Sequence, residues 1–127
     1  MAVPITALFG AFHAVFNVAL AANVTRVRAQ SQVFLGTGDN DALLLASRRH
    51  GNNAEYVPLA LVLLLTAELA GGGATALYAL GAALTLGRIA HAIGVGAKPS
   101  PLRAIGAVLT WLTIAGSGIY ALLASMR

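Results

Sequence analysis

The sequence contains no cysteine among its 127 residues. Disulfides, a cysteine nucleophile of the protein itself and thiolate metal ligands are therefore excluded, and any thiol chemistry must come from a bound ligand. Charge is also scarce, because 9% of the residues are charged while 58% are hydrophobic. A soluble domain of this size cannot cover so much apolar surface with polar groups, so the composition predicts a membrane protein.

The uncharged segments have the length that a bilayer requires. A hydrocarbon core about 30 Å thick needs roughly 20 apolar residues for each helical span. Residues 3–24, 70–87 and 104–126 carry no charge, and a fourth apolar run at residues 56–67 reaches span length with the half-polar turns before it. We expect one all-α integral membrane domain over residues 1–127, a bundle of four transmembrane helices.

The breaks between these segments set the expected helix bounds, at about residues 4–30, 42–69, 75–95 and 102–125. Pro4 is tolerated in a first helical turn, and Asp41 is expected to be the N-cap of the second helix. The first segment is expected to be retained rather than cleaved as a signal peptide, because no Lys or Arg precedes Arg26 and the apolar run is of full span length.

The basic residues are unevenly distributed between the two sides of such a bundle. Alternating spans place the connections at residues 31–41 and 96–101 on one side, and the termini on the other, where Arg127 lies. The positive-inside rule makes the crowded side cytoplasmic and puts both termini outside. The net charge of +4 belongs to helix ends, so no nucleic-acid partner is expected. The crowded side holds Arg26, Arg28, Arg48, Arg49, Arg88, Lys98 and Arg103.

Polar side chains inside the predicted spans mark a candidate site, because charge within a membrane is costly. Arg48, Asn52 and Glu55 follow one another at i, i+4 and i+7 and form a stripe on one helix face. An ionised Glu55 at that depth needs a cation or a donor network. Simple pairing of Glu55 with an arginine, to lock the helices together, is the alternative interpretation.

The third helix supplies Arg88 and His91, at i and i+3 on one face and at the same membrane level. Together with Arg26 at the end of the first helix and Arg103 at the start of the fourth, they complete a cluster from all four helices. Such a cluster suits a small ligand with carboxylates and an ammonium group, since arginine forks hold carboxylates. Arg103 also has a simpler interpretation, snorkelling to lipid phosphate.

Two further polar residues, His13 and Asn17, lie at i and i+4 in the first helix, nearer the opposite half of the bilayer. A hydrogen bond between helices explains them better than a second site does. No histidine spacing fits a metal, so no metal site is expected.

The segment Arg48-Arg49-His50-Gly51-Asn52-Asn53-Ala54-Glu55-Tyr56-Val57-Pro58 resembles the second-helix signature of the MAPEG family, the membrane-associated proteins in eicosanoid and glutathione metabolism. Three shorter segments are similar to other parts of that family, in the same order along the whole chain. A Gly-x-Gly-Asp loop recurs in bacterial members, which makes this a bacterial-type sequence. The shorter segments are Thr25-Arg26-Val27-Arg28, Gly87-Arg88-Ile89-Ala90-His91-Ala92 and Leu102-Arg103.

The resemblance implies a homotrimer of four-helix subunits that binds glutathione between neighbouring subunits, near the cytoplasmic face of a bacterial inner membrane. Arg103 matches the arginine credited with stabilising the thiolate, which makes it the candidate catalytic residue. Lowering a thiol pKa by one unit takes about 1.4 kcal/mol, which a close cation can supply. Arg88 is included among the candidate glutathione-binding residues because it belongs to the polar cluster described above. The glutathione contacts carried over by position are Arg26, Arg48, Asn52, Glu55, Tyr56 and His91.

The sequence departs from the eicosanoid-forming members at two positions. Val95 stands where many of them have a tyrosine, and Ala104 follows the arginine where some have a small hydroxyl residue. The leading hypothesis is therefore a glutathione transferase or peroxidase that acts on lipophilic electrophiles from the bilayer. A non-catalytic glutathione- or lipid-binding membrane protein is the alternative. A small multidrug exporter ranks third, because the first helix lacks a carboxylate to couple protons.

Overall fold

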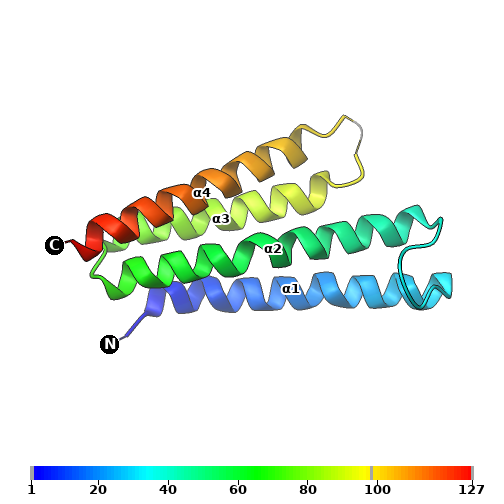
Figure 1. The fold of residues 1–127 in the computed structure, drawn as a ribbon, viewed down its shortest axis with the longest axis horizontal. Coiled ribbons are helices and arrows are strands. Elements are labelled where there is room, and N and C mark those ends of the chain that lie inside the picture. Colours follow the sequence, from blue (N-terminus) through cyan, green and yellow to red (C-terminus); the bar gives the residue numbers. More distant parts are fainter. Residues whose placement is uncertain (1, 98, 127) are drawn as a thin grey trace.

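The computed structural model describes residues 2–97 and 99–126, which form four helices in an antiparallel bundle (Figure 1). The helices are α1 (Pro4–Ser31), α2 (Asp41–Leu69), α3 (Ala74–Gly94) and α4 (Pro101–Ser125). Each end differs from the end expected from the sequence by no more than one residue. Lys98 and Arg127, which the sequence places on opposite sides, lie outside the described residues.

Three of the helices in the described chain, α1, α3 and α4, are long and apolar enough to cross a membrane. The predicted helical membrane bundle is confirmed to that extent. The helix α2 is the longest of the four, with 29 residues, but it carries Arg48, Arg49 and Glu55, which lower its hydropathy below that of the other three. Both α2 and α3 pack against all three of the other helices.

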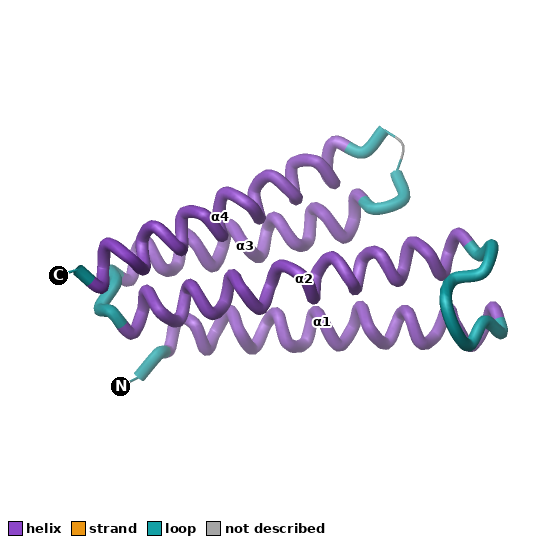
Figure 2. Tube along the Cα trace, in the orientation of Figure 1, coloured by secondary structure: helices purple, strands orange, loops and turns teal. Residues whose placement is uncertain are grey.

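Both termini and the α2–α3 turn lie at one end of the bundle, which we call the terminal end. The α1–α2 and α3–α4 loops lie at the other, the loop end (Figure 2). The α1–α2 pair and the α3–α4 pair run close together at the terminal end and diverge toward the loop end (Figure 1).

The terminal end is closed by apolar packing. Ile5, Leu64, Leu77 and Ala121 are buried there, one from each helix, with Phe9 and Leu80 packed against them. Polar groups seal the surface of this end. The Glu68 carboxylate accepts hydrogen bonds from the backbone N–H groups of Ile5 and Thr6, at 3.0 and 2.7 Å, which satisfies two donors that an α-helix leaves free at its start.

The N-cap of α2 corrects one expectation. The cap is Asn40, whose side-chain oxygen accepts from the Leu43 N–H at 2.8 Å, whereas Asp41 is the first residue of the helix. Asn40 has the extended backbone that a capping residue requires, which leaves Asp41 in the first turn, where a negative charge favours the helix dipole.

Glycines allow α3 and α4 to approach each other closely at the loop end. A Cβ on Gly106 would collide with the backbone of Gly87 and His91, and one on Gly94 would collide with the backbone of Arg103. Small residues permit such contacts between membrane helices. Here they bring the first turns of α4 against the last turns of α3.

Candidate functional site

A cavity of about 360 Å³ lies at the loop end between α2, α3, the α3–α4 loop and the start of α4. Its polar side chains are Arg48 and Asn52 from α2, His91 from α3 and Arg103 from α4. Ligand pockets of small molecules begin at about this volume. The rest of the wall is apolar or backbone, from Leu44, Leu45, Val95, Gly96 and Ala97.

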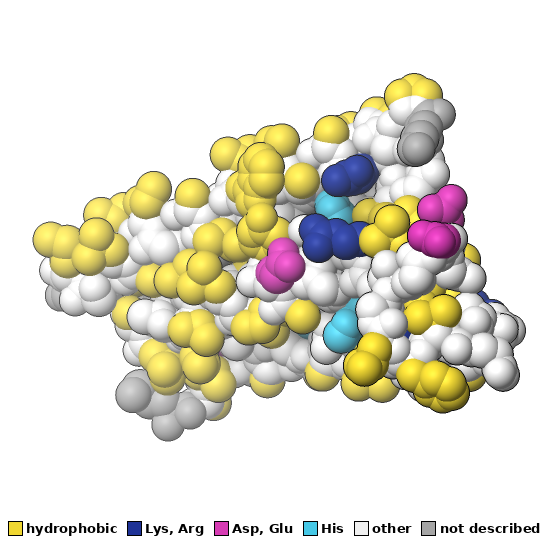
Figure 3. Space-filling model, turned by 45° about the vertical axis from the view of Figure 1, so that its right-hand side comes forward, with side chains coloured by type: hydrophobic (Ala, Val, Ile, Leu, Met, Phe, Trp, Pro, Cys, Tyr) yellow, Lys and Arg dark blue, Asp and Glu magenta, His cyan; other side chains and the backbone are white. Residues whose placement is uncertain are grey.

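Basic, acidic and histidine side chains are seen together on one face of the molecule, in its half nearer the loop end (Figure 3). Apolar side chains cover most of the other half in the same view. The cavity wall contains two guanidinium groups and no carboxylate. The cavity is therefore electropositive, which suits an anionic ligand. The apolar surface of the other half of the molecule suits a lipophilic one.

The α3–α4 loop is fixed by hydrogen bonds that place Arg103 at this cavity. The Ser100 hydroxyl donates to the Gly94 carbonyl and accepts from the Arg103 N–H at 3.3 Å, so one side chain joins the end of α3 to the start of α4. Arg49 donates to the carbonyl of Val95 at 2.7 Å. The guanidinium of Arg103 forms no hydrogen bond with any described residue, and the residue is exposed.

Arg88 lies behind the cavity rather than in its wall. The residue is 1% exposed, and its guanidinium donates to the side-chain oxygens of Asn52, Asn53 and Thr110 at 2.8, 3.3 and 3.5 Å. Its Nη2 is 3.4 Å from His91 Nδ1. Arg88 therefore contacts both α2 and α4 and supports two of the side chains that line the cavity.

The network continues to α1, because Asn53 donates to Asn17 Oδ1 at 3.1 Å. Thus Asn17, Asn53, Arg88 and Thr110 link all four helices in one layer. His13 Nε2 is 3.3 Å from Thr85 Oγ1 on α3. The prediction that Asn17 and His13 make hydrogen bonds between helices is confirmed.

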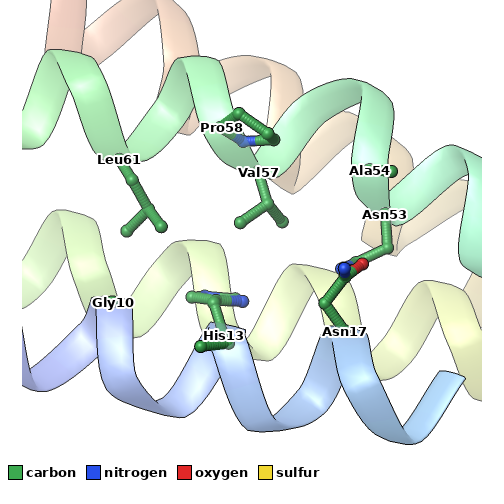
Figure 4. A pocket seen from close by; sticks show the side chains of 9 residues that line it. Gly10, His13, Asn17, Asn53, Ala54, Val57, Pro58 and Leu61 are labelled. Carbon is green, nitrogen blue, oxygen red and sulfur yellow. The ribbon is translucent and has the colours of Figure 1, made fainter. Parts of the chain in front are cut away.

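A second cavity, of about 300 Å³, lies on the other side of this layer between α1 and α2 (Figure 4). The side chains of Asn17 and Asn53 meet at one end of it, and His13 points from α1 toward Val57. Its other wall residues are Gly10, Ala14, Ala54, Pro58 and Leu61, so it is mostly apolar.

The residues predicted from the sequence divide into two groups. Arg48, Asn52, His91 and Arg103 meet in the loop-end cavity. The others do not line it: Arg88 supports the wall from behind, Tyr56 is half-buried, and Glu55 is exposed on α2. Arg26 is exposed on α1 and donates to Asn23 Oδ1 at 2.8 Å. No ion pair to Glu55 is formed within residues 2–97 and 99–126.

Sequence reasoning did not assign Asn53, Thr110 or Ser100. Asn53 stands inside the recognised α2 segment, and its position one residue after Asn52 turns it toward the bundle interior, where it is 1% exposed. Nothing in the sequence distinguishes Thr110 from the other hydroxyl residues of α4. Ser100 stands immediately before Pro101, the first residue of α4, and a serine followed by proline in this way is a pattern typical of an N-cap.

The fold and the site define an α-helical membrane protein with a cationic cavity at one end of its bundle. Residues 6–123 match the MAPEG family, and the chain belongs to that family. It is 32% identical over 110 residues to "Inner membrane protein YecN" of Escherichia coli K12, a match that covers 87% of this chain and 84% of that protein. The same protein of E. coli O6:H1 matches to the same extent. No solved structure matches the chain significantly.

Proposed function

We propose that this protein binds glutathione in the loop-end cavity. It then acts as a glutathione transferase or peroxidase on lipophilic electrophiles. The observation that supports this most is the meeting of Arg48, Asn52, His91 and Arg103 around one cavity. Arginine guanidinium groups bind carboxylates through paired hydrogen bonds, and glutathione has two carboxylates. Membership of the MAPEG family supports the same ligand.

Glutathione supplies a thiol whose anion attacks an electrophile, and the residues of this chain provide the setting for that anion. Arg103, with no hydrogen-bond partner among the described residues, is the cation available to stabilise a thiolate. Arg48 and Asn52 hold acceptor groups of the ligand. Exposed apolar side chains next to Arg103 in the first turns of α4, such as Leu102 and Ile105, give a lipophilic molecule a route from the bilayer.

The cavity of one chain accounts for the carboxylates but not for the ammonium group, because no carboxylate lines its wall. Glu55 is exposed on α2, about two turns from Arg48 and on the same outward face. Charged side chains directed at lipid are costly, so a second copy of the chain is expected to cover this face. We therefore propose a homotrimer in which Glu55, Tyr56 and Arg26 of one subunit contribute to a site shared with its neighbour.

The membrane arrangement follows from the same proposal. We infer that α2 also spans the bilayer, in contact with the other helices and with further copies rather than with lipid. The relative in E. coli is named an inner membrane protein, which supports a bacterial inner membrane location. The basic loop end is then cytoplasmic and both termini face outside.

Arg103→Ala tests the enzymatic proposal. Detergent-solubilised protein is expected to conjugate glutathione to chlorodinitrobenzene, and the variant is expected to lose about tenfold or more of the rate at pH 6.5, the effect of about one unit in the thiol pKa. Raising the pH to about 9 should restore part of the rate, because the free thiol then ionises without help. Equal rates with and without wild-type protein, over several electrophiles, would contradict turnover.

Arg28→Ala is the matched control. Its guanidinium lies at the same end but donates to the backbone carbonyls of Val33 and Gly36, at 2.9 and 3.0 Å, and does not line the cavity. The rate should remain that of the wild type.

One observation favours the alternative of binding without turnover. Val95, the C-cap residue of α3, lines the cavity together with His91, is 6% exposed and offers no hydroxyl to a bound thiol. Under this alternative, calorimetry shows glutathione binding that is lost in Arg48→Ala, while no conjugation is detected with any electrophile.

A further inference from the structure

Arg88 is a buried cation that is held only by neutral groups. Its partners within the described chain are two asparagine oxygens from α2, the Thr110 hydroxyl of α4 and a nitrogen of His91. Burying a charge is costly unless it is fully hydrogen-bonded. The guanidinium has five N–H donors and no acceptor, so every group that contacts it must accept.

This requirement determines the orientation of the Asn52 side-chain amide. Because Arg88 Nη2 donates at 2.8 Å, the atom of Asn52 that faces it is the oxygen. The amide nitrogen of Asn52, with its two N–H donors, is then the group left for the cavity that Asn52 lines. A buried arginine thus determines which end of the amide meets a ligand.

The same reasoning determines which nitrogen of the His91 ring carries the proton. Arg88 Nη2 lies 3.4 Å from Nδ1, and since arginine cannot accept, Nδ1 must carry the lone pair rather than a proton. The neutral ring therefore holds its proton on Nε2, which has no hydrogen-bond partner among residues 2–97 and 99–126. His91 lines the cavity, so it presents an N–H donor there.

We propose that Arg88 is a positioning residue that makes the polar side chains of the loop-end cavity donors only. Through Arg88, the amide of Asn52 and the imidazole of His91 add N–H donors to the guanidinium groups of Arg48 and Arg103. Such a wall selects ligands by their acceptors: carboxylates and a thiolate bind, whereas esters of the same ligand lose charge-assisted hydrogen bonds. This inference deepens the proposed glutathione site, but the state of the His91 ring holds without any ligand.

The amide of Asn53 shows the same directional order on the other side of Arg88. Asn53 accepts from Arg88 Nε through its oxygen and donates to Asn17 through its nitrogen. One donor-only side chain therefore orients the amides of Asn52, Asn53 and Asn17.

The test is the ¹⁵N NMR spectrum of the histidine rings in the full protein, in detergent or nanodiscs, without ligand and near neutral pH. Among the three histidines, His91→Phe identifies the relevant signals. The wild type should show a protonated Nε2 and an unprotonated Nδ1 for His91. A protonated Nδ1 or a charged ring in the wild type overturns the proposal, and this readout needs no variant of Arg88.

Arg88→Met supplies the second arm, because methionine fills similar space without a donor. The His91 signals should shift toward the Nδ1–H form, and the preference for glutathione over its diester, measured by calorimetry, should fall at least fivefold. Thr110→Val is the matched control, since it removes a contact of Arg88 that does not reach the cavity. Its His91 signals and ligand preference should be those of the wild type.

If Arg88 has a purely structural role, Arg88→Met lowers the affinities for glutathione and for its diester equally. An unchanged ratio of the two affinities would therefore contradict the proposal. If the wild type binds no glutathione, the proposed function fails, while the ring spectrum still decides the role of Arg88.

Discussion

At the terminal end of the bundle, Leu64, Leu77 and Ala121 pack tightly together, whereas at the loop end the helices are joined through Arg88 and its polar partners. The apolar contacts are individually weak and collectively large, and none of them has the directionality of a hydrogen bond. The polar contacts have directions, so each one fixes the orientation of a side chain. We infer from this difference that apolar packing at the terminal end supplies stability, whereas the polar contacts at the loop end set the orientation of the side chains around the cavity. The predictions below, in order of decreasing effect, test this division.

Leu77→Ala should cause the largest loss of stability, roughly 3 kcal/mol, because Leu77 is 1% exposed and its truncation leaves a void in the terminal core. The free energy of unfolding can be followed by SDS titration with far-UV circular dichroism. Glutathione affinity should not change under conditions where the variant is folded. Leu86→Ala on the same helix, at a side chain that is 62% exposed, is the control with a small effect. A weakened affinity in Leu77→Ala would show that the two ends are coupled.

Gly106→Ala should affect both properties, because a methyl group there collides with the backbone of Gly87 and His91. Overpacking of this kind costs about 2 kcal/mol. The separation of α4 from α3 also moves Arg103 relative to His91, so conjugation activity should fall along with stability. Gly116→Ala is the control in the same helix, since its added methyl group would lie 3.6 Å from Leu80, an ordinary contact. Full activity in Gly106→Ala would mean that the cavity tolerates displacement of α4.

Glu68→Gln should have the smallest effect, about 1 kcal/mol, through loss of the carboxylate that accepts from Ile5 and Thr6. The glutamine keeps one acceptor oxygen, so the start of α1 frays rather than unfolds. Faster amide hydrogen exchange at residues 5–7, with unchanged ligand affinity, is the expected result. Asp39→Asn removes an acidic charge from an exposed loop and serves as the control. Equal amide exchange rates at residues 5–7 in the two variants would show that Glu68 does not cap α1.

Much of the fold was accessible from the sequence because the membrane imposes simple rules. Uncharged runs of span length predict helices, and glycine and proline mark their ends. The sequence predicts Asp41 as the N-cap of α2, whereas the structure has Asn40, because both residue types cap helices and only the backbone conformation distinguishes them.

The candidate site was predicted in part. Arg48, Asn52, His91 and Arg103 share the cavity, as their spacing and the family resemblance suggested. The residues predicted to form one stripe on α2 point in different directions, because Asn52 and Glu55 are separated by about 60° around the helix axis. That angle is enough to turn Asn52 toward Arg88 and leave Glu55 on the outer face.

The sequence by itself determined the membrane class, the helix bounds and the family, because these depend on composition, periodicity and a contiguous segment. Only the tertiary structure decided that Arg88 supports the cavity from behind instead of lining it, and that Asn53 and Thr110 are its partners. Those contacts join residues of different helices, and no rule of local spacing fixes how two helices rotate against each other. That rotation depends on where the glycines of α3 and α4 allow the backbones to meet.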